Sequence, residues 1–328
     1  MRSIYFILLL FFIFACNSKT IKQETPQNAL DSISINITSD SLNADLYFKR
    51  AGLFVKEKKI DAAIADLQKA ISLNSNKASF YFSLSDLFLF KNQSRQAKEA
   101  LEKCIALDPK NTKAMLKLAE IYTVVKLYDQ SNAYINKSLE IEPDNATAYF
   151  MKGYNYKETG DSAKAISNMQ IAVDKNQKYY EAYIQLGILF GAKKNKLAVS
   201  YYNNALNLNP KSIEAHFDLG VYYQNIYDLN KAIQEYTIIV SNIDSTFSKA
   251  YYNLGYIHSE LLSLYSEARN YYSKAARYDP NYIEAFYMRG LMSERLGDIG
   301  NAKKDYELAL NLNPQYELAL DGLRRVKK

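Results

Sequence analysis

Two histidines and two cysteines are the side chains of this 328-residue chain best suited to metal binding or nucleophilic attack. His216 and His258 stand far apart, and neither has a companion at the spacing of a zinc site. Two thiols are too few for a disulfide framework. The sequence contains no glycine-rich phosphate loop and no Ser-His-Asp arrangement. We therefore expect no metal, no cofactor and no small-molecule substrate, and a chain that is not an enzyme.

The first sixteen residues, MRSIYFILLLFFIFAC, combine one arginine with an apolar run that ends before Cys16. A run of this length is too short to span a bilayer and suits the apolar region of a secretory signal. The segment Ile13-Phe14-Ala15-Cys16 resembles the lipobox of bacterial lipoproteins. The resemblance implies that residues 1–16 form a lipoprotein signal peptide ending at Cys16, which would be acylated. An ordinary cleaved signal, or an uncleaved anchor, is the alternative.

Residues 17–43 are rich in Ser, Asn and Thr and lack a sustained helical period. This composition predicts a flexible tether between the membrane and the folded part. The lipoprotein resemblance implies secretion across the inner membrane and a lipid anchor in the bacterial envelope. Residues 17–20 lack the acidic side chains that follow the cysteine in some surface-exposed lipoproteins. We therefore expect the outer membrane, with the folded part facing the periplasm.

The overall composition is that of a globular, helix-rich chain. Hydrophobic residues make up 48% and charged residues 23%, and the chain has only 11 glycines and 6 prolines. Few Gly and Pro in a long chain favour helices joined by short turns. The net charge is +6, and Lys and Arg do not form a run that would neutralise a phosphate backbone. Nucleic acid is therefore not expected as a partner.

A repeated phrase organises the rest of the chain. Residues 104–119 read CIALDPKNTKAMLKLA, residues 205–220 read ALNLNPKSIEAHFDLG, and residues 309–323 read ALNLNPQYELALDGL. The prolines in this register are Pro109, Pro143, Pro210, Pro280 and Pro314. Their spacings of 34, 67, 70 and 34 are close to one or two periods of 34 residues.

This period resembles the tetratricopeptide repeat, a helix–turn–helix unit whose positions are numbered 1 to 34. The last unit carries Phe286, Gly290, Ala302, Tyr306, Ala309 and Pro314 at positions 4, 8, 20, 24, 27 and 32. The resemblance covers residues 44–316 in eight units: 44–77, 78–111, 112–145, 146–179, 180–212, 213–247, 248–282 and 283–316. It implies an all-α, right-handed superhelical solenoid of eight units, with residues 317–328 as a capping helix.

The units depart from a strict period in a few places. The fifth lacks one residue, expected in its inter-helix turn, and the seventh has one extra residue, expected in the same turn. Another extra residue is expected at 245–247. The first three units carry Ala51, Ser85 and Ala119 at position 8, where glycine stands elsewhere. A small residue there is expected to let the two helices of a unit approach.

Most side chains that could take part in catalysis or metal binding fall at packing positions of the repeat. His216 occupies position 4, His258 position 11 and Cys104 position 27, so all three are expected to be structural. Most tyrosines occupy positions 4, 11 and 24, which also face the core.

The resemblance further implies a concave groove lined by positions 2, 5, 6, 9, 12 and 13 of the first helices. Its apolar members are Phe48, Phe82, Phe90, Leu116, Phe150, Met151, Tyr154, Phe217, Tyr252, Tyr256, Tyr287 and Met288. Aromatic and Met side chains in such a surface suit capture of a peptide. The alternative is that several of them only pack against the adjacent unit.

Charge suggests which half of the groove binds. In the last four units, six carboxylates face two cations: Glu181, Glu214, Asp218, Glu260, Glu284 and Glu294 against Lys249 and Arg295. We expect a partner segment with aliphatic and basic residues to dock there, near Glu214 and Asp218; a merely solvated face is the alternative.

The function expected is that of a lipid-tethered, non-catalytic scaffold that binds an envelope protein during complex assembly. A glycan or cell-wall binding module that uses Tyr154, Tyr252 and Tyr256 is the alternative.

Overall fold

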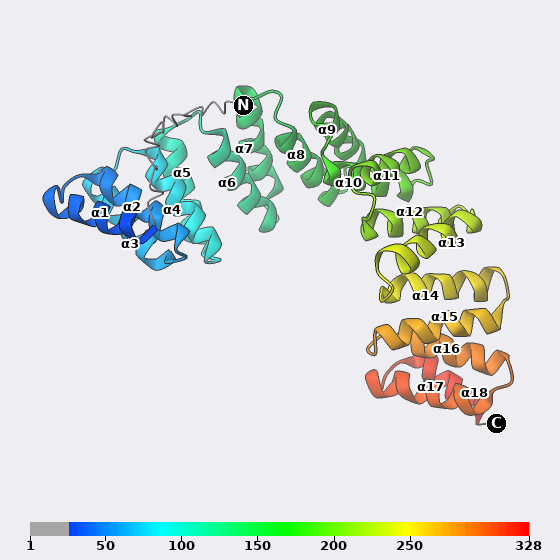
Figure 1. The fold of residues 1–328 in the computed structure, drawn as a ribbon. Helices are drawn as coiled ribbons and strands as arrows, with labels where there is room; N and C mark the ends of the chain where they lie inside the picture. Colours follow the sequence, from blue (N-terminus) through cyan, green and yellow to red (C-terminus); the bar gives the residue numbers. More distant parts are fainter. Residues whose placement is uncertain (1–25, 328) are drawn as a thin grey trace, which may run out of the picture. The chain divides into compact units, whose positions relative to one another are not determined.

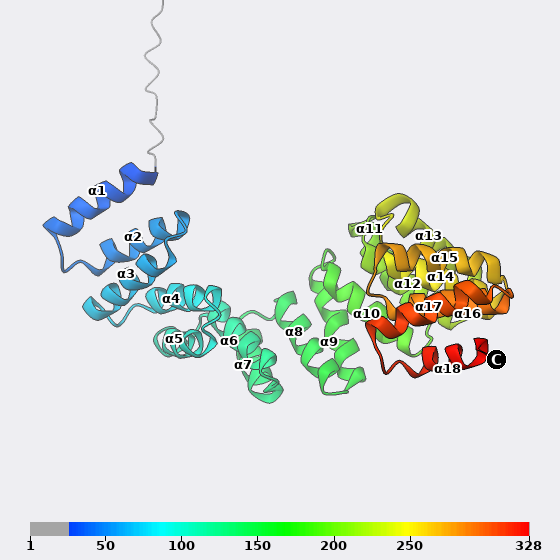
Figure 2. The same ribbon diagram turned by 90° about the horizontal axis from the view of Figure 1, so that it is seen from below.

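The computed structural model describes residues 26–327, which form eighteen α-helices and no strand (Figure 1). The chain divides into two compact units, one ending at Ala114 and the other beginning at Met115. Within each unit, consecutive helices lie side by side and run in opposite directions (Figures 1 and 2). The predicted all-helical architecture of stacked helical pairs is thus confirmed.

Unit 1 contains two helical pairs preceded by a single helix. Its helices are α1 (Pro26–Ser39), α2 (Ala44–Lys56), α3 (Ile60–Leu73), α4 (Ala78–Phe90) and α5 (Ser94–Leu107). Helix α6 (Thr112–Val124) begins at the end of this unit and continues into the next.

Unit 2 continues the same pattern to the end of the described chain. Its helices are α7 (Tyr128–Ile141), α8 (Ala146–Glu158), α9 (Ser162–Lys175), α10 (Tyr180–Ala192), α11 (Leu197–Leu208), α12 (Ile213–Asn225), α13 (Leu229–Ile238), α14 (Ser248–Tyr256), α15 (Tyr265–Tyr278), α16 (Ile283–Arg295), α17 (Ile299–Leu312) and α18 (Glu317–Val326). The first residue of every predicted repeat is also the first residue of a helix.

Helix α1 corrects the prediction of a flexible tether over residues 17–43. Leu30 and Ile37 are buried, and Ile37 packs in one cluster with Tyr47 of α2. Leu30 and Ile37 are seven residues apart, so both lie on one helical face. The sequence hides this face because Ile33, Ile35 and Ile37 alternate with polar residues, which mimics a strand; Ile35 is 65% exposed. Residues 1–25, which include Cys16 and the rest of the tether, lie outside the described residues.

In the last four repeats, tyrosine rings at position 24 explain the glycines at position 8, and in the fourth repeat Met169 takes the place of the ring against Gly153. A Cβ atom built on Gly187 would lie 2.5 Å from the Tyr202 ring, and one built on Gly220 would lie 2.6 Å from the Tyr236 ring. The same contact recurs at Gly255 with Tyr272 (2.8 Å) and at Gly290 with Tyr306 (3.0 Å). The ring occupies the space of the missing side chain, so position 8 has to be glycine wherever position 24 is tyrosine.

The early repeats use a different pair at these positions. Ala51, Ser85 and Ala119 stand at position 8, and all three are buried. Their partners at position 24 are the smaller, aliphatic Leu67, Leu101 and Ile135, which are also buried. The larger residue at position 8 is thus matched by a narrower one at position 24, and the volume between the helices is conserved.

The two extra residues are accommodated within helices rather than in turns, which corrects both predictions. A π-helical turn over Ile239–Ile243 extends α13, and its Asp244 amide donates to the Ile239 carbonyl over 2.8 Å. A second π-helical turn, Ile257–Leu261, extends α14. A π-helical turn accommodates one more residue and keeps its backbone groups hydrogen-bonded. A longer turn between helices would leave those backbone groups without such hydrogen bonds.

The missing residue of the fifth repeat is taken from its second helix. Helix α11 has 12 residues, whereas α9 has 14, and four residues separate it from α10. The deletion therefore shortens α11 and leaves a turn that is no shorter than the others.

The turn between the two helices of each repeat contains one residue with a left-handed backbone. These residues are Lys58, Asn92, Lys126, Gly160, Lys194, Tyr227, Ser263 and Gly297. Only two of them are glycines, the residue that adopts this conformation without a steric cost. The other turns therefore hold a mild local strain.

Candidate functional site

The first helices of successive repeats present a shared surface, here called the first-helix face, made of positions 2, 5, 6, 9, 12 and 13. In unit 2, hydrogen bonds and ion pairs connect neighbouring first helices across it. Lys157 Nζ of α8 donates to Gln185 Oε1 of α10 over 2.9 Å. Arg295 of α16 lies 3.5 Å from the Glu260 carboxylate, which follows α14. The face is therefore continuous from one repeat to the next in this unit.

Aromatic side chains at position 5 pack between helices. The Tyr252 ring lies 5.4 Å from the Tyr272 ring and 5.0 Å from the Tyr282 ring, measured between centroids. Comparable ring contacts hold Phe48 (with Phe80), Phe150 (with Tyr179), Phe217 (with Tyr236 and Phe247) and Tyr287 (with Tyr306 and Tyr316). These rings are half-buried and contact other rings of their own repeat, except Phe48, which contacts the next repeat. Packing is therefore their main role, and only their remaining surface could contact a partner.

Met288 does not line the surface as its spacing predicts. It is only 9% exposed and belongs to a core cluster with Tyr272 and Met292. Position 6 of the eighth repeat faces inward because the unbranched Met side chain can reach the gap between α15 and α16. Leu116 and Met151 are half-buried beside Ile135, and Phe82 is half-buried on α4.

A few predicted groove residues do face solvent. Phe90 is 72% exposed on α4, and Tyr256 is 36% exposed on α14. Tyr154 is half-buried, with the Lys157 ammonium 5.0 Å from its ring centroid. These three residues, with the exposed edges of the position-5 rings, are the aromatic surface available on the face.

Unit 1 has a pocket on its part of the first-helix face. The pocket has a volume of about 450 Å³ and lies between α2 and α4, with Phe48, Gly52 and Leu87 in its wall. It exists because Gly52 has no side chain at position 9, where an added Cβ would meet nothing within 4 Å. Lys49, Lys56 and Asp86 also line it, so it combines an apolar floor with charges of both signs.

Two carboxylates stand out on the first-helix face of unit 2. Asp218 is half-buried on α12 and makes no ion pair or hydrogen bond within the part of the chain described. Burial, and then repulsion by Glu214, raises the pKa of Asp218 to about 6. Glu214 is exposed one turn earlier, with its Oε2 3.5 Å from the Tyr180 hydroxyl. A half-buried acid without a cation is a binding point for a positive group.

Two other acids predicted to line the groove already have partners. Arg325 of α18 donates two hydrogen bonds of 2.8 Å to the Glu294 carboxylate. These bonds hold the pKa of Glu294 below its usual value. Glu260 pairs with Arg295, as described above. The predicted groove acids without an ion pair in the described chain are therefore Glu181, Glu214, Asp218 and Glu284, and Asp218 alone of these is half-buried.

His216 and Cys104 occupy the structural positions that the repeat register predicts. The His216 ring is buried, with Nδ1 2.6 Å from the Glu235 carboxylate and Nε2 3.3 Å from the Pro210 carbonyl. Burial alone would lower the pKa of His216, but these two acceptors together raise it. Cys104 is fully buried, and burial raises its thiol pKa to about 11, so it is unreactive at neutral pH. His258 is half-buried and its Nδ1 donates to the Leu254 carbonyl over 2.7 Å.

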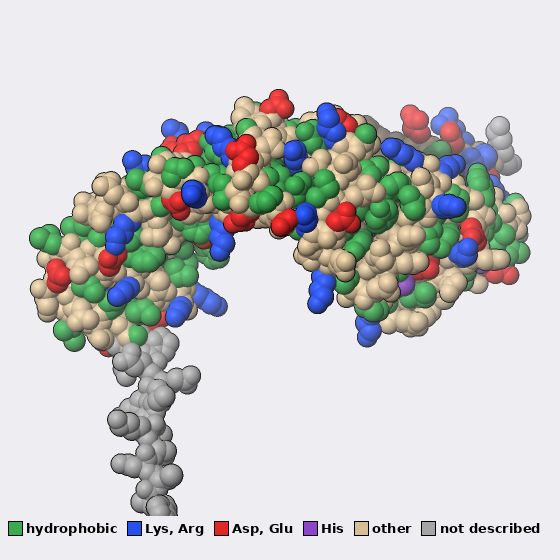
Figure 3. Space-filling view, turned by 90° about the horizontal axis from the view of Figure 1, so that it is seen from above, with side chains coloured by type: hydrophobic (Ala, Val, Ile, Leu, Met, Phe, Trp, Pro, Cys, Tyr) green, Lys and Arg blue, Asp and Glu red, His purple; other side chains and the backbone are tan. Residues whose placement is uncertain are grey.

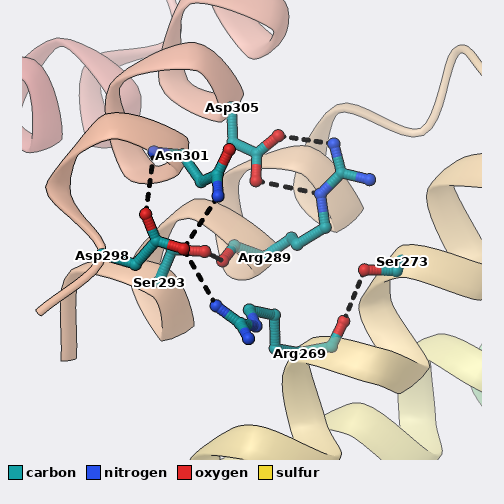
Figure 4. Close-up of polar contacts among 7 residues, drawn as sticks. All are labelled: Arg269, Ser273, Arg289, Ser293, Asp298, Asn301 and Asp305. Atoms are coloured by element: carbon teal, nitrogen blue, oxygen red, sulfur yellow. Dashed lines mark hydrogen bonds and ion pairs between the residues drawn. The ribbon is translucent and has the colours of Figure 1, made fainter. Parts of the chain in front are cut away.

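The sequence reasoning missed a polar cluster between α15, α16 and α17, shown in Figure 4. Arg289 makes a two-point contact with the buried Asp305, and Arg269 lies 3.2 Å from Asp298. Arg50 and Asp66 form the same pair at the same repeat positions in unit 1. This recurrence was the signal available in the sequence. Because its charged groups pair with one another, the cluster stabilises the helix packing rather than offering a free site.

Residues 26–327 contain no group of three or more His, Cys, Asp or Glu placed to hold a metal ion. None of the helices described is both long and apolar enough to cross a membrane. In each unit, Lys and Arg are intermixed with Asp and Glu over the surface shown in Figure 3.

Comparison with known families identifies one match. Profiles described as tetratricopeptide repeat match residues 44–77, 91–151, 146–174, 201–234, 248–282 and 283–316. No curated protein matches the chain.

Solved structures with a similar fold are also repeat proteins. The C-terminal part of a TPR repeat-containing protein from Cytophaga hutchinsonii is 20% identical, with a TM-score of 0.63 over 74% of this chain and 99% of that one. A tetratricopeptide repeat protein from Parabacteroides merdae is 16% identical, with a TM-score of 0.55 over 76% of this chain and 99% of that one. At these identities the likeness shows the fold.

Proposed function

Because the chain belongs to the tetratricopeptide repeat family, whose repeats serve protein interaction, we propose that it is a non-catalytic scaffold that captures a partner on the first-helix face of unit 2. The partner would be an envelope protein that presents a segment with basic and apolar side chains.

The single observation that carries the proposal is the unpaired, half-buried Asp218 beside Glu214. Burying a carboxylate without a partner is unfavourable, so a Lys or Arg of an incoming segment would relieve that cost. The half-buried Phe217 ring next to Asp218 offers apolar surface for the stem of such a side chain. Charge and apolar surface at one place suit a short basic segment better than an acidic or purely apolar one.

The membrane location belongs to the same proposal. Ile13-Phe14-Ala15-Cys16 would direct acylation of Cys16 and hold the scaffold at the envelope, with the outer membrane as the expected site. Its role would be to position an envelope protein during complex assembly. Palmitate labelling of the expressed chain should disappear in Cys16→Ala, whereas persistent label would refute lipidation.

Site-specific photocrosslinking in intact cells tests the binding face. A photoreactive group at Glu214 or Tyr256 should capture a protein, because both positions are exposed on the first-helix face. The matched control is Asn203, which is equally exposed but lies on the second helix α11. In the chain with the photoreactive group at Tyr256, charge reversal of Glu214 and Asp218 to Lys should abolish the captured band. Equal capture from Asn203, or a band unaffected by the reversal, would reject this face.

A further inference from the structure

Unit 2 contains a polar pocket away from the first-helix face. Its volume is about 540 Å³, within the range of roughly 300–1,000 Å³ usual for ligand sites. It lies between α9, α10 and α11, which are neighbours in Figure 1. Four side-chain amides line it, from Gln170, Gln177, Asn204 and Asn207. None of these residues occupies a position of the first-helix face.

The polar groups of this pocket are largely unused by the protein. Only Gln170 has a side-chain partner, donating to the Tyr201 hydroxyl over 3.0 Å. Gln177, Asn204 and Asn207 are exposed, and their side chains make no hydrogen bond to any residue described. They therefore contribute little to folding and remain free to bind a ligand.

Tyrosine rings and one carboxylate complete the wall. The buried Tyr183 and the half-buried Tyr201 line the pocket, together with the exposed Asp174. Neither Lys nor Arg is among the lining residues, and the only aliphatic ones are Val173 and Leu208. A phosphate or carboxylate ligand would find no cation here, and an apolar ligand would find little apolar surface.

The equivalent space between the following repeats is occupied by the protein itself. At the next junction, His216 and Glu235 replace the two tyrosines, and they bind each other over 2.6 Å. One junction later, the Tyr251 and Tyr278 rings stack with centroids 5.6 Å apart, and the Lys274 ammonium lies 5.3 Å from the Tyr251 ring centroid. The open, amide-lined space is thus a property of the α9–α11 junction and not of the repeat as such.

We propose that this pocket binds a neutral oligosaccharide. An amide side chain can donate and accept hydrogen bonds at the same time. Sugar hydroxyls can also do both, so the two kinds of group are complementary. The Asp174 carboxylate can accept from two hydroxyls. The Phe190 ring stacks on one face of the half-buried Tyr201 ring, so the rest of the Tyr201 ring is the aromatic surface available to the C–H side of a sugar ring. An extended peptide would instead require pockets for apolar or charged side chains, which the lining does not provide.

Ligand-observed magnetic resonance on the full chain in detergent tests the proposal. The probes are N,N′,N″-triacetylchitotriose and cellotriose, two neutral trisaccharides that differ in their acetamido groups. At least one should show saturation transfer from the protein. The double variant Asn204→Ala/Asn207→Ala should bind it at least tenfold more weakly, because two amides are lost. Asn203→Ala is the matched control and should bind normally, since Asn203 is exposed on α11 but does not line the pocket.

Circular dichroism should show that the double variant folds normally, because both asparagines are exposed and lack side-chain hydrogen bonds. Three results would overturn the proposal: neither trisaccharide binds, binding survives in the double variant, or Tyr256→Ala removes binding instead. A peptide control completes the test. If an uncharged peptide with blocked ends displaces the sugar and binds more tightly at this pocket, the saccharide site is likewise rejected.

Discussion

The pairing of glycine at position 8 with tyrosine at position 24 makes a quantitative prediction for Gly187 and Tyr202. In Gly187→Ala, the new Cβ would lie 2.5–2.8 Å from three ring atoms of Tyr202, against 3.4–4 Å for an ordinary contact. Because Tyr202 is buried, the ring has little room to withdraw. Overpacking of this kind lowers the free energy of unfolding by about 1–3 kcal/mol or more. The higher helix propensity of alanine than of glycine raises it by about 1 kcal/mol. We expect a net loss of about 1–2 kcal/mol.

The double variant Gly187→Ala/Tyr202→Leu rebuilds the Ala–Leu pair of Ala51 and Leu67. Tyr202→Leu alone should destabilise by about 2–3 kcal/mol, because a large buried ring is replaced by a smaller group. Adding Gly187→Ala to it should then restore up to about 1 kcal/mol, since the clash no longer exists. The coupling energy should therefore be about 1–3 kcal/mol.

Urea unfolding followed by far-ultraviolet circular dichroism measures all four members of this cycle. Gly52→Ala is the control, because nothing lies within 4 Å of its added Cβ and the position is exposed on α2. It should be neutral or stabilise by up to about 1 kcal/mol. If the effects of the two single variants simply add, to within about 0.5 kcal/mol, the ring does not dictate the glycine and the reasoning is refuted.

Three further predictions concern unit 2. Between about pH 4 and pH 6 the folded chain holds more protons at Asp218 than the unfolded chain, so the free energy of unfolding falls as pH rises through about 6. Asp218→Asn should therefore raise the free energy of unfolding by on the order of 1 kcal/mol at neutral pH and leave it unchanged near pH 4. Urea unfolding at both pH values measures the difference. The raised pKa of His216 means that its protonated ring stabilises the folded state; this stabilisation is present below the pKa of His216 in the unfolded chain and is lost as pH rises through its pKa in the folded chain. His216→Gln or Glu235→Gln should therefore flatten the pH dependence of the melting temperature. An unchanged pH profile would count against the ion pair. Tyr227→Gly should stabilise by about 0.5–1 kcal/mol, because φ is +62° there, while a loss of stability in thermal melts would show that the turn is unstrained.

Local features of the sequence determined much of this fold. Prolines, small residues and aromatic residues recur at one interval, and each acts within a single helical pair or turn. The start of α12 at Ile213 and of α16 at Ile283 could therefore be predicted to the residue. The burial of His216 and Cys104 followed from the same register, because a position that faces the neighbouring helix in one repeat does so in the others.

The tertiary structure decided whatever depends on contacts between elements. Docking of α1 needed the cluster of Ile37 with Tyr47, which alternating isoleucines disguise. The extra residues became π-turns because backbone hydrogen bonding favoured them over longer loops. Asp218 became the half-buried unpaired acid of its face because no cation of the described chain reaches it, whereas Arg325, far along the chain, binds Glu294. The amide pocket is open because only Gln170 pairs across its junction, with Tyr201, while Gln177, Asn204 and Asn207 have no side-chain partner among the described residues. The repeat interval specifies which positions face inward, but it does not specify which side chains find partners there.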